Sequence, residues 1–245
     1  VRRNYIVRKS VNLSKETHIV ASNLDRAYLI VTIAKPRTSS GFIDRFLVTA
    51  EAYGIPTTIV FNKFDLLISD KETMLRQEEL EGIYTRAGYE TMRVSAESGL
   101  GIKEFREELN SGINLLSGHS GVGKSTIINL LIPGLELKTA DVSESHSKGR
   151  HTTTFAEMFL VPGGGFIIDT PGIKGFGLVT LGKSTLNHHF PEFFKLLHDC
   201  KFHNCVHMGE PGCAVKKQVE AGKVSKERYS NYCDMYKTFE DGPYR

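Results

Sequence analysis

A glycine-rich segment that ends in lysine and serine carries the clearest chemistry in this sequence. Residues 118–125 match the pattern G-x-x-x-x-G-K-S in full, after an apolar run and before a helical pattern. Glycines let the backbone curl so that N–H groups converge on phosphate oxygens, and the start of the helix adds a favourable dipole. We expect Lys124 to reach the β and γ phosphates of a nucleotide and Ser125 to ligate Mg²⁺. The predicted phosphate-binding set is Gly118, His119, Ser120, Gly121, Val122, Gly123, Lys124, Ser125 and Thr126.

A second motif predicts which base is bound. Asn62-Lys63-Phe64-Asp65 follows an apolar run and reads N-K-x-D. The Asp65 carboxylate can accept two hydrogen bonds from the N1–H and 2-amino groups of guanine, a donor pair that adenine lacks. We expect Asn62 to brace the base and the phosphate loop, and Ser95-Ala96 resembles an element whose backbone contacts the guanine carbonyl. The motifs therefore favour GTP and GDP and argue against an ATP-binding regulator.

Two more segments are typical of groups that sense the γ phosphate. D-T-P-G begins at Asp169, which we expect to hold Mg²⁺ through water, and the N–H of Gly172 would touch the γ phosphate. The upstream run G-R-H-T-T-T (149–154) offers hydroxyl groups for Mg²⁺. Either Thr153 or Thr154 fits this role, with Thr153 taken as the candidate, and an ordinary strand start would also account for the threonines.

The group that orients the attacking water is not the usual one. Ras-like GTPases carry Gln directly after D-x-x-G, whereas this chain has Ile173, which cannot hydrogen-bond to water. The predicted catalytic set is therefore His151, Lys124 and Thr153. A loop-shaping role for His151 stays open, and so does the alternative of a nucleotide-gated binding module with negligible hydrolysis.

A cluster of soft ligands lies in the last fifth of the chain. Cys200-x₄-Cys205-x-His207-x₅-Cys213 places three thiols and one imidazole within fourteen residues. Four such ligands on short loops suit a tetrahedral, structural Zn²⁺. Variants that use Cys233 or His203 in place of His207 remain open, as does a set of buried cysteines beside a surface histidine.

Strand and helix patterns alternate along the chain and predict an α/β fold with a doubly wound, mostly parallel sheet. Apolar β-branched runs predict strands at 28–33, 55–61, 91–94, 113–116, 154–160 and 165–169. Helical spacing predicts helices at 41–53, 71–87, 102–109, 124–131, 190–197 and 226–239.

The order of the motifs is informative because ordinary G domains begin with the phosphate loop. This chain begins with N-K-x-D and S-A, and the phosphate loop, the threonine run and D-T-P-G follow. The same sheet forms if the old termini are joined and the chain is opened elsewhere, which the closeness of domain termini allows. We therefore expect a circularly permuted G domain whose D-T-P-G segment leads into the cysteine-rich region, so that loss of the γ phosphate biases that region.

Composition sets wide limits. The chain has 245 residues and a net charge of +3, enough for a G domain and a smaller unit. No apolar run of about 18 residues is present, so we expect no membrane span. The chain starts without Met or an apolar leader, which predicts part of a longer polypeptide. Basic residues gather at both ends, and solvated faces or RNA contact would explain them: Arg2, Arg3, Arg8, Lys9, Lys216, Lys217, Lys223, Lys226 and Arg228.

The motifs together resemble the RsgA (YjeQ) family of ribosome small-subunit-dependent GTPases. The resemblance rests on the permuted order, GHSGVGKST, GRHTTT, DTPGI, NKFD and the cluster CKFHNCVHMGEPGC. It implies a late assembly factor of the small ribosomal subunit in the bacterial cytoplasm, contact with rRNA, and GTP hydrolysis stimulated by the subunit. It also implies that Cys200, Cys205, His207 and Cys213 bind zinc.

The resemblance also implies a domain order. Residues 1–22 would be the end of an N-terminal OB-fold, 23–180 the permuted GTPase domain, and 181–245 a helical zinc-binding domain. An OB barrel needs about five strands, so most of it would lie outside this sequence. We expect a monomer with neither a membrane nor DNA as a partner.

Overall fold

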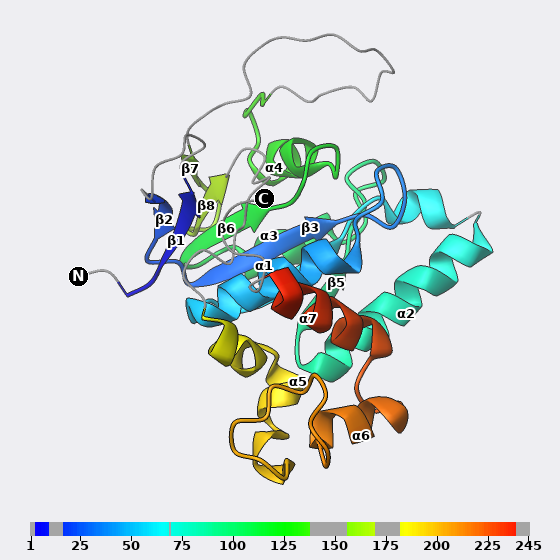
Figure 1. Cartoon of the computed structure of the whole chain (residues 1–245). Helices are drawn as coiled ribbons and strands as arrows, with labels where there is room; N and C mark the ends of the chain where they lie inside the picture. Colours follow the sequence, from blue (N-terminus) through cyan, green and yellow to red (C-terminus); the bar gives the residue numbers. More distant parts are fainter. Residues whose placement is uncertain (1–2, 10–16, 69, 138–155, 170–181, 239–245) are drawn as a thin grey trace, which may run out of the picture.

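Six strands form the central sheet of the protein in the order β5-β4-β3-β6-β8-β7 (Figure 1). The structure is a computed structural model, and it describes residues 3–9, 17–68, 70–137, 156–169 and 182–238. The strands are β3 (Arg26–Val31), β4 (Thr57–Phe61), β5 (Glu90–Arg93), β6 (Ile113–Ser117), β7 (Glu157–Leu160) and β8 (Phe166–Asp169). In this sheet only β7, at one edge, runs antiparallel to its neighbour; the other described pairs of the sheet are parallel. The predicted doubly wound, mostly parallel sheet is confirmed.

The central strands are buried on both faces, as their largely apolar and β-branched sequences predict. Alternate residues of β3 face different cores: Leu29 packs against α1 and α2, and Ile30 packs against α3 and α4. Figure 1 shows α1 and α3 on opposite faces of β3. The helices of this layer are α1 (Ser40–Ala52), α2 (Lys71–Ala87), α3 (Ile102–Glu108) and α4 (Lys124–Leu131), and the 3₁₀ turn η1 spans Phe64–Leu67.

Local capping accounts for where the two longest of these helices begin. The hydroxyl of Ser39 accepts a hydrogen bond from the Phe42 N–H at the start of α1. The Asp70 carboxylate does the same for Thr73 at the start of α2. Both predicted helices agree with the structure to within one residue.

The C-terminal region is built from short helical pieces around a third core. They are η2 (Lys183–His189), α5 (Pro191–Phe194), η3 (Leu197–Asp199), α6 (Ala214–Glu220) and α7 (Lys226–Thr238). The aromatic rings of Phe190, Phe193 and Tyr232 fill this core, and Val48 of α1 completes it. The C-terminal region therefore packs on the sheet domain through α1, and Figure 1 shows α7 lying across that helix.

The prediction of one helix over 190–197 is wrong. The α-helix ends after a single turn at Phe194, and a separate 3₁₀ turn follows before Cys200. This break lets Phe193 point into the core and still brings the chain to the cysteine cluster. The sequence reading also missed α6, which starts directly after Cys213, whose sulfur accepts a hydrogen bond from the Lys216 N–H.

A two-stranded antiparallel hairpin precedes the sheet: β1 (Tyr5–Lys9) pairs with β2 (Thr17–Ser22). The side-chain amide of Asn4 exchanges hydrogen bonds with the backbone of Leu24, and Arg3 forms an ion pair with Asp25. The hairpin lies within residues 1–22, whose assignment to the end of an OB-fold stays a prediction. No helix in the described ranges is long and apolar enough to cross a lipid bilayer.

Candidate nucleotide site and metal centre

Four sequence motifs of the predicted nucleotide site lie at the carboxyl ends of parallel strands. N-K-x-D follows β4, Ser95 follows β5, the phosphate loop follows β6, and Asp169 ends β8. Because neighbouring parallel strands end at the same edge, motifs far apart in the chain meet there. Strand β3 lies between β4 and β6, so the segment after β3 lies beside both N-K-x-D and the phosphate loop.

Asn62 ties two of these loops together. Its amide Nδ2 donates to the carbonyl oxygen of Val122 in the phosphate loop at 2.7 Å. Its Oδ1 accepts from the N–H of Ala96 at 3.2 Å. The residue is only 2% exposed, so either bond would be costly to lose. The bond to Val122 agrees with the expected bracing of the phosphate loop, and the contact between Asn62 and the base stays a prediction.

The remaining residues of N-K-x-D lie around the same edge. Asp65 accepts a hydrogen bond from the hydroxyl of Ser95 at 2.5 Å. Lys63 adopts a left-handed backbone with φ of 64°, and its ammonium group donates to the Lys35 carbonyl at 2.5 Å. Left-handed backbone is uncommon outside glycine and often accompanies functional sites. Burial lowers the pKa of Lys63. The guanidinium of Arg93 lies 5.2 Å from the centre of the Phe64 ring.

The phosphate loop needs its glycines for steric reasons. A Cβ at Gly118 would lie 2.6 Å from the Ile30 carbonyl oxygen. Gly123 has φ of 90° and faces the Asn62 amide directly. Helix α4 then starts at Lys124, whose ammonium group forms an ion pair with Asp169. Both residues were predicted to serve the phosphates and Mg²⁺, and the structure brings their side chains together.

Half-buried side chains of the first turn of α4 complete the loop; these are Ser125 and Thr126. Ser120 and Gly121 are exposed on the loop, while Val122 is buried in the core beneath it. The buried Val122 side chain anchors the loop, while Ser120 and Gly121 remain exposed.

The side chain of His119 points to the segment after β3. Its Nε2 lies 2.6 Å from the Thr38 hydroxyl, and its ring packs edge-on against Phe42 with centroids 5.5 Å apart. Any contact between this residue and a nucleotide is therefore left to its backbone. Sequence reasoning gave no role to Thr38 or Phe42, since no spacing signal links them to residue 119.

Several predicted residues lie outside the described part of the chain: His151, Thr153, Thr154, Gly172 and Ile173. Their catalytic and magnesium-binding roles stay predictions.

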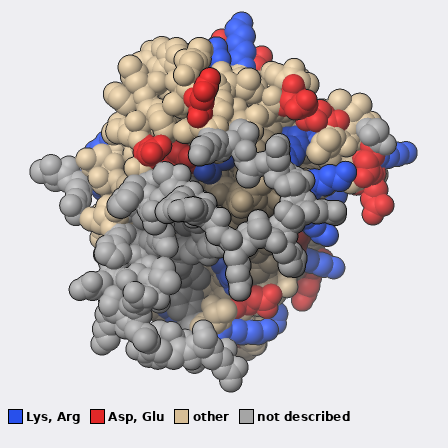
Figure 2. Space-filling view, turned by 90° about the horizontal axis from the view of Figure 1, so that it is seen from above, with Lys and Arg blue, Asp and Glu red and all other residues tan. Residues whose placement is uncertain are grey.

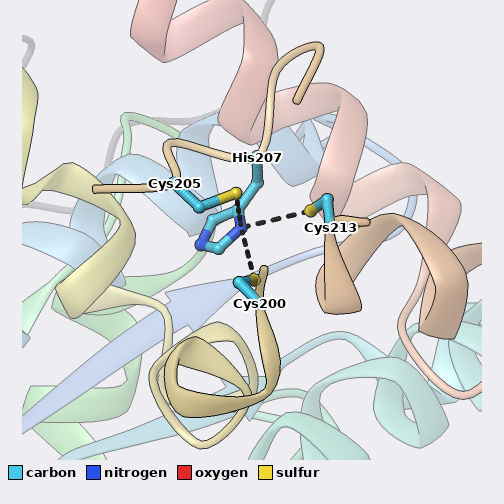
Figure 3. A group of neighbouring side chains, drawn as sticks. All are labelled: Cys200, Cys205, His207 and Cys213. Atoms are coloured by element: carbon cyan, nitrogen blue, oxygen red, sulfur yellow. Dashed lines mark hydrogen bonds between the residues drawn. The ribbon is translucent and has the colours of Figure 1, made fainter. Parts of the chain in front are cut away.

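The four predicted zinc ligands converge (Figure 3). The Nδ1 atom of His207 lies 3.3 Å from the sulfur of Cys213, 3.4 Å from that of Cys205 and 3.7 Å from that of Cys200. Zinc–sulfur and zinc–nitrogen bonds of about 2.3 and 2.0 Å give tetrahedral edges of about 3.5–3.8 Å. The cluster therefore fits one tetrahedral zinc ion, and neither Cys233 nor His203 belongs to it.

Burial also acts on the ionisation of the cluster. It raises the pKa of the Cys205 thiol to about 12 and lowers the pKa of His207. A divalent metal bound here would displace the thiol protons and be held by thiolates. His207 has a left-handed φ of 61°, and two tyrosines of α7 hold its loop: Tyr229 donates to the His207 carbonyl at 2.6 Å and Tyr232 to the Val206 carbonyl at 2.5 Å.

One basic residue of the C-terminal cluster is not on a solvated face. Arg228 is 1% exposed and forms ion pairs with Asp44 of α1 and Glu192 of α5, both at 2.5 Å. The interpretation of the whole cluster as surface is wrong at this position, because the carboxylates that bury Arg228 come from distant parts of the chain.

Comparison with known proteins agrees with this arrangement. The sequence profile described as RsgA GTPase matches residues 1–179. The chain belongs to the RsgA GTPase family. A curated RsgA relative, "Small ribosomal subunit biogenesis GTPase RsgA" of Bacteroides fragilis, is 53% identical over 244 residues, covering all of this chain and 78% of its own. The protein of the same name from Flavobacterium psychrophilum is 51% identical over 245 residues, with 74% of its length covered.

Solved structures show the same fold. The crystal structure of YjeQ from Thermotoga maritima matches with a TM-score of 0.80 and 35% identity, over all of this chain and 77% of that one. YloQ, a circularly permuted GTPase, matches with a TM-score of 0.75 over 98% of this chain and 80% of its own; at 24% identity this likeness concerns the fold alone. The predicted circular permutation is confirmed, and as an RsgA GTPase the chain is an enzyme that uses guanine nucleotide with Mg²⁺.

Proposed function

We propose that this protein hydrolyses GTP to GDP and phosphate as a late assembly factor of the small ribosomal subunit, which stimulates the reaction. The observation that carries the nucleotide site is the Asn62 amide, which bonds the phosphate loop and the S-A loop at once. The curated relatives from Bacteroides fragilis and Flavobacterium psychrophilum, both named for small-subunit biogenesis, support the assembly role.

In this proposal, different residues bind the base, the phosphates and Mg²⁺. Asp65 accepts the guanine donors, and the hydroxyl of Ser95 orients that carboxylate. The backbone of residues 118–126 holds the phosphates, and Lys124 offsets their charge. Ser125 and Asp169 would hold Mg²⁺, which supplies further charge neutralisation on the phosphate oxygens when bound.

The hydrolytic step is proposed from residues outside the described ranges. His151 would position the attacking water, because the hydrophobic Ile173 occupies the place of the usual glutamine. Thr153 would complete the magnesium site. A water-positioning group that is ordered by the ribosomal subunit would account for stimulation.

The cysteine cluster is proposed to hold one structural zinc ion and to shape the C-terminal surface. We further propose contact with rRNA and action as a monomer, without a DNA partner. Charge does not single out the rRNA-binding face in Figure 2, where Lys and Arg side chains alternate with Asp and Glu on the described surface. The contact would then depend on shape and on a few local basic groups.

The decisive test is steady-state GTP hydrolysis by the purified protein, alone and with small ribosomal subunits. We expect strong stimulation in the parent and in Glu104→Gln, an exposed carboxylate control on α3. Asp65→Asn should lose GTP binding and gain affinity for xanthosine triphosphate, because an amide can donate to the 2-oxo group of xanthine. Tight GTP binding without stimulation would contradict the enzymatic assembly role and would favour a nucleotide-gated binding module.

A further inference from the structure

The start of helix α1 touches the phosphate loop. Thr38, two residues before the helix, lies 2.6 Å from His119 through its hydroxyl, and Phe42 in the first turn packs on the same imidazole ring. The Thr38 hydroxyl also accepts a hydrogen bond from the Thr32 N–H at 3.0 Å, which fixes the segment to the end of β3. The position of His119 is therefore set by residues that flank the N-terminus of α1.

The same turns of α1 bind helix α7 of the C-terminal region. The side-chain amide of Asn231 donates to the Asp44 carboxylate at 2.6 Å and to the Ser40 hydroxyl at 3.1 Å. Arg228 donates to the other oxygen of Asp44 at 2.5 Å. Asp44 is fully buried, so these bonds are shielded from water and hold α7 to α1 at a defined place.

Helix α7 in turn holds the metal loop, through the two tyrosine–carbonyl bonds at His207 and Val206. The path from the cysteine cluster to the phosphate loop therefore crosses only two helices. Each step along it is a packed or hydrogen-bonded contact.

We infer that Asn231 is a positioning residue for the phosphate loop, acting through α1, and that α1 couples nucleotide binding to the zinc-binding region. The inference rests on the proposed nucleotide site. It adds a route that is separate from the D-T-P-G segment, which reaches the same region through the chain itself. A partner that binds and shifts α7 would change the affinity for nucleotide, and by linkage the nucleotide would change the affinity for that partner by the same factor.

The test compares Asn231→Leu with Asp234→Asn, a control on the same helix whose side chain is 67% exposed. Affinity for a fluorescent GDP analogue is measured at fixed Mg²⁺, after circular dichroism has verified that each variant is folded. We expect Asn231→Leu to weaken GDP binding about two- to thirty-fold, the range seen for residues that modulate coupling without touching the ligand. The control should bind as the parent does.

A double-variant cycle separates this route from a general loss of structure. Thr38→Val removes the hydroxyl that faces His119 and keeps the side-chain shape, and Thr38→Ser retains the hydroxyl and should restore affinity. If the effect of Asn231→Leu passes through α1, it should largely disappear in the Thr38→Val background. In hydrogen exchange, GDP should slow the amides of α7 in the parent and do so much less in Thr38→Val.

The outcomes are distinct. A parent protein that fails to bind GDP overturns the proposed nucleotide site and this inference with it. A parent that binds GDP, together with an Asn231→Leu variant that binds equally well, overturns the coupling alone. Strictly additive losses in the double variant also overturn it.

Discussion

The buried charge cluster of Arg228 predicts a large and pH-dependent loss of stability. Replacing Arg228 with Met removes three hydrogen bonds and leaves the carboxylates of Asp44 and Glu192 without their cation. Arg228 is 1% exposed and Asp44 is 0% exposed, so water cannot replace the lost partner. Breaking a buried ion pair in this way costs about 3–5 kcal/mol of unfolding free energy.

The pH dependence follows from Asp44. Burial raises its pKa to about 6, although Arg228 opposes the shift, so removing Arg228 raises the pKa further. An acid whose folded pKa is raised destabilises the fold where it is ionised, and protonation below that pKa removes the cost. The deficit of Arg228→Met should therefore be full at pH 8 and should shrink as the pH falls toward 5.

Urea unfolding at pH 8 and at pH 5.5 measures both effects. Lys226→Met, at an exposed position of the same helix, serves as the matched control. Adding Asp44→Asn to Arg228→Met should recover much of the stability at pH 8, because the uncompensated charge is removed. A deficit below about 1 kcal/mol would refute the reasoning, since the stated cost of breaking such a pair is several times larger. A deficit that is the same at both pH values would refute the role of Asp44.

Three further outcomes are expected. Asn62→Ala should lower the unfolding free energy of the nucleotide-free protein by about 1–3 kcal/mol, because it leaves backbone groups in two loops without hydrogen-bond partners. If urea unfolding is unchanged from the parent, Asn62 contributes to nucleotide binding and not to the stability of the fold. Gly118→Ala should abolish GDP binding, measured by calorimetry, because the new Cβ would clash with a backbone carbonyl of β3. A GDP affinity equal to that of the parent would show that the phosphate loop can shift to avoid this clash. Atomic absorption should detect one zinc ion in the parent and in the control Cys233→Ser, but none in Cys213→Ser. Equal zinc content in the two variants would exclude the assigned ligand set.

Local patterns were enough to predict the nucleotide motifs and the metal ligands. The phosphate loop joins a strand to a helix within a few consecutive residues, so one short segment of sequence contains both the binding groups and the elements that position them. The metal ligands lie within fourteen residues, and the short loops between them leave few other residues that could complete the cluster. The β-branched and apolar run of β4 predicted a buried strand, and the structure agrees.

The motif order predicted the permutation, but strand order was decided by the tertiary structure. Placing β3 between β4 and β6 brings the segment after β3 beside the phosphate loop, and this creates the contact between Thr38 and His119, 81 residues apart. No periodicity in the sequence encodes such a pair, because its two members belong to different elements.

The burial of Arg228 was likewise decided by the tertiary structure and not by the local sequence. An arginine in a basic stretch is expected on the surface, since burial of a charge is unfavourable without a partner. Here the partner Asp44 comes from 184 residues away and is brought into contact by the packing of α7 on α1. The sequence by itself predicted the nucleotide motifs and the metal ligands, because the residues within each motif are close along the chain. Only the tertiary structure decided how the two sites are joined, because that depends on which distant helices share a buried face.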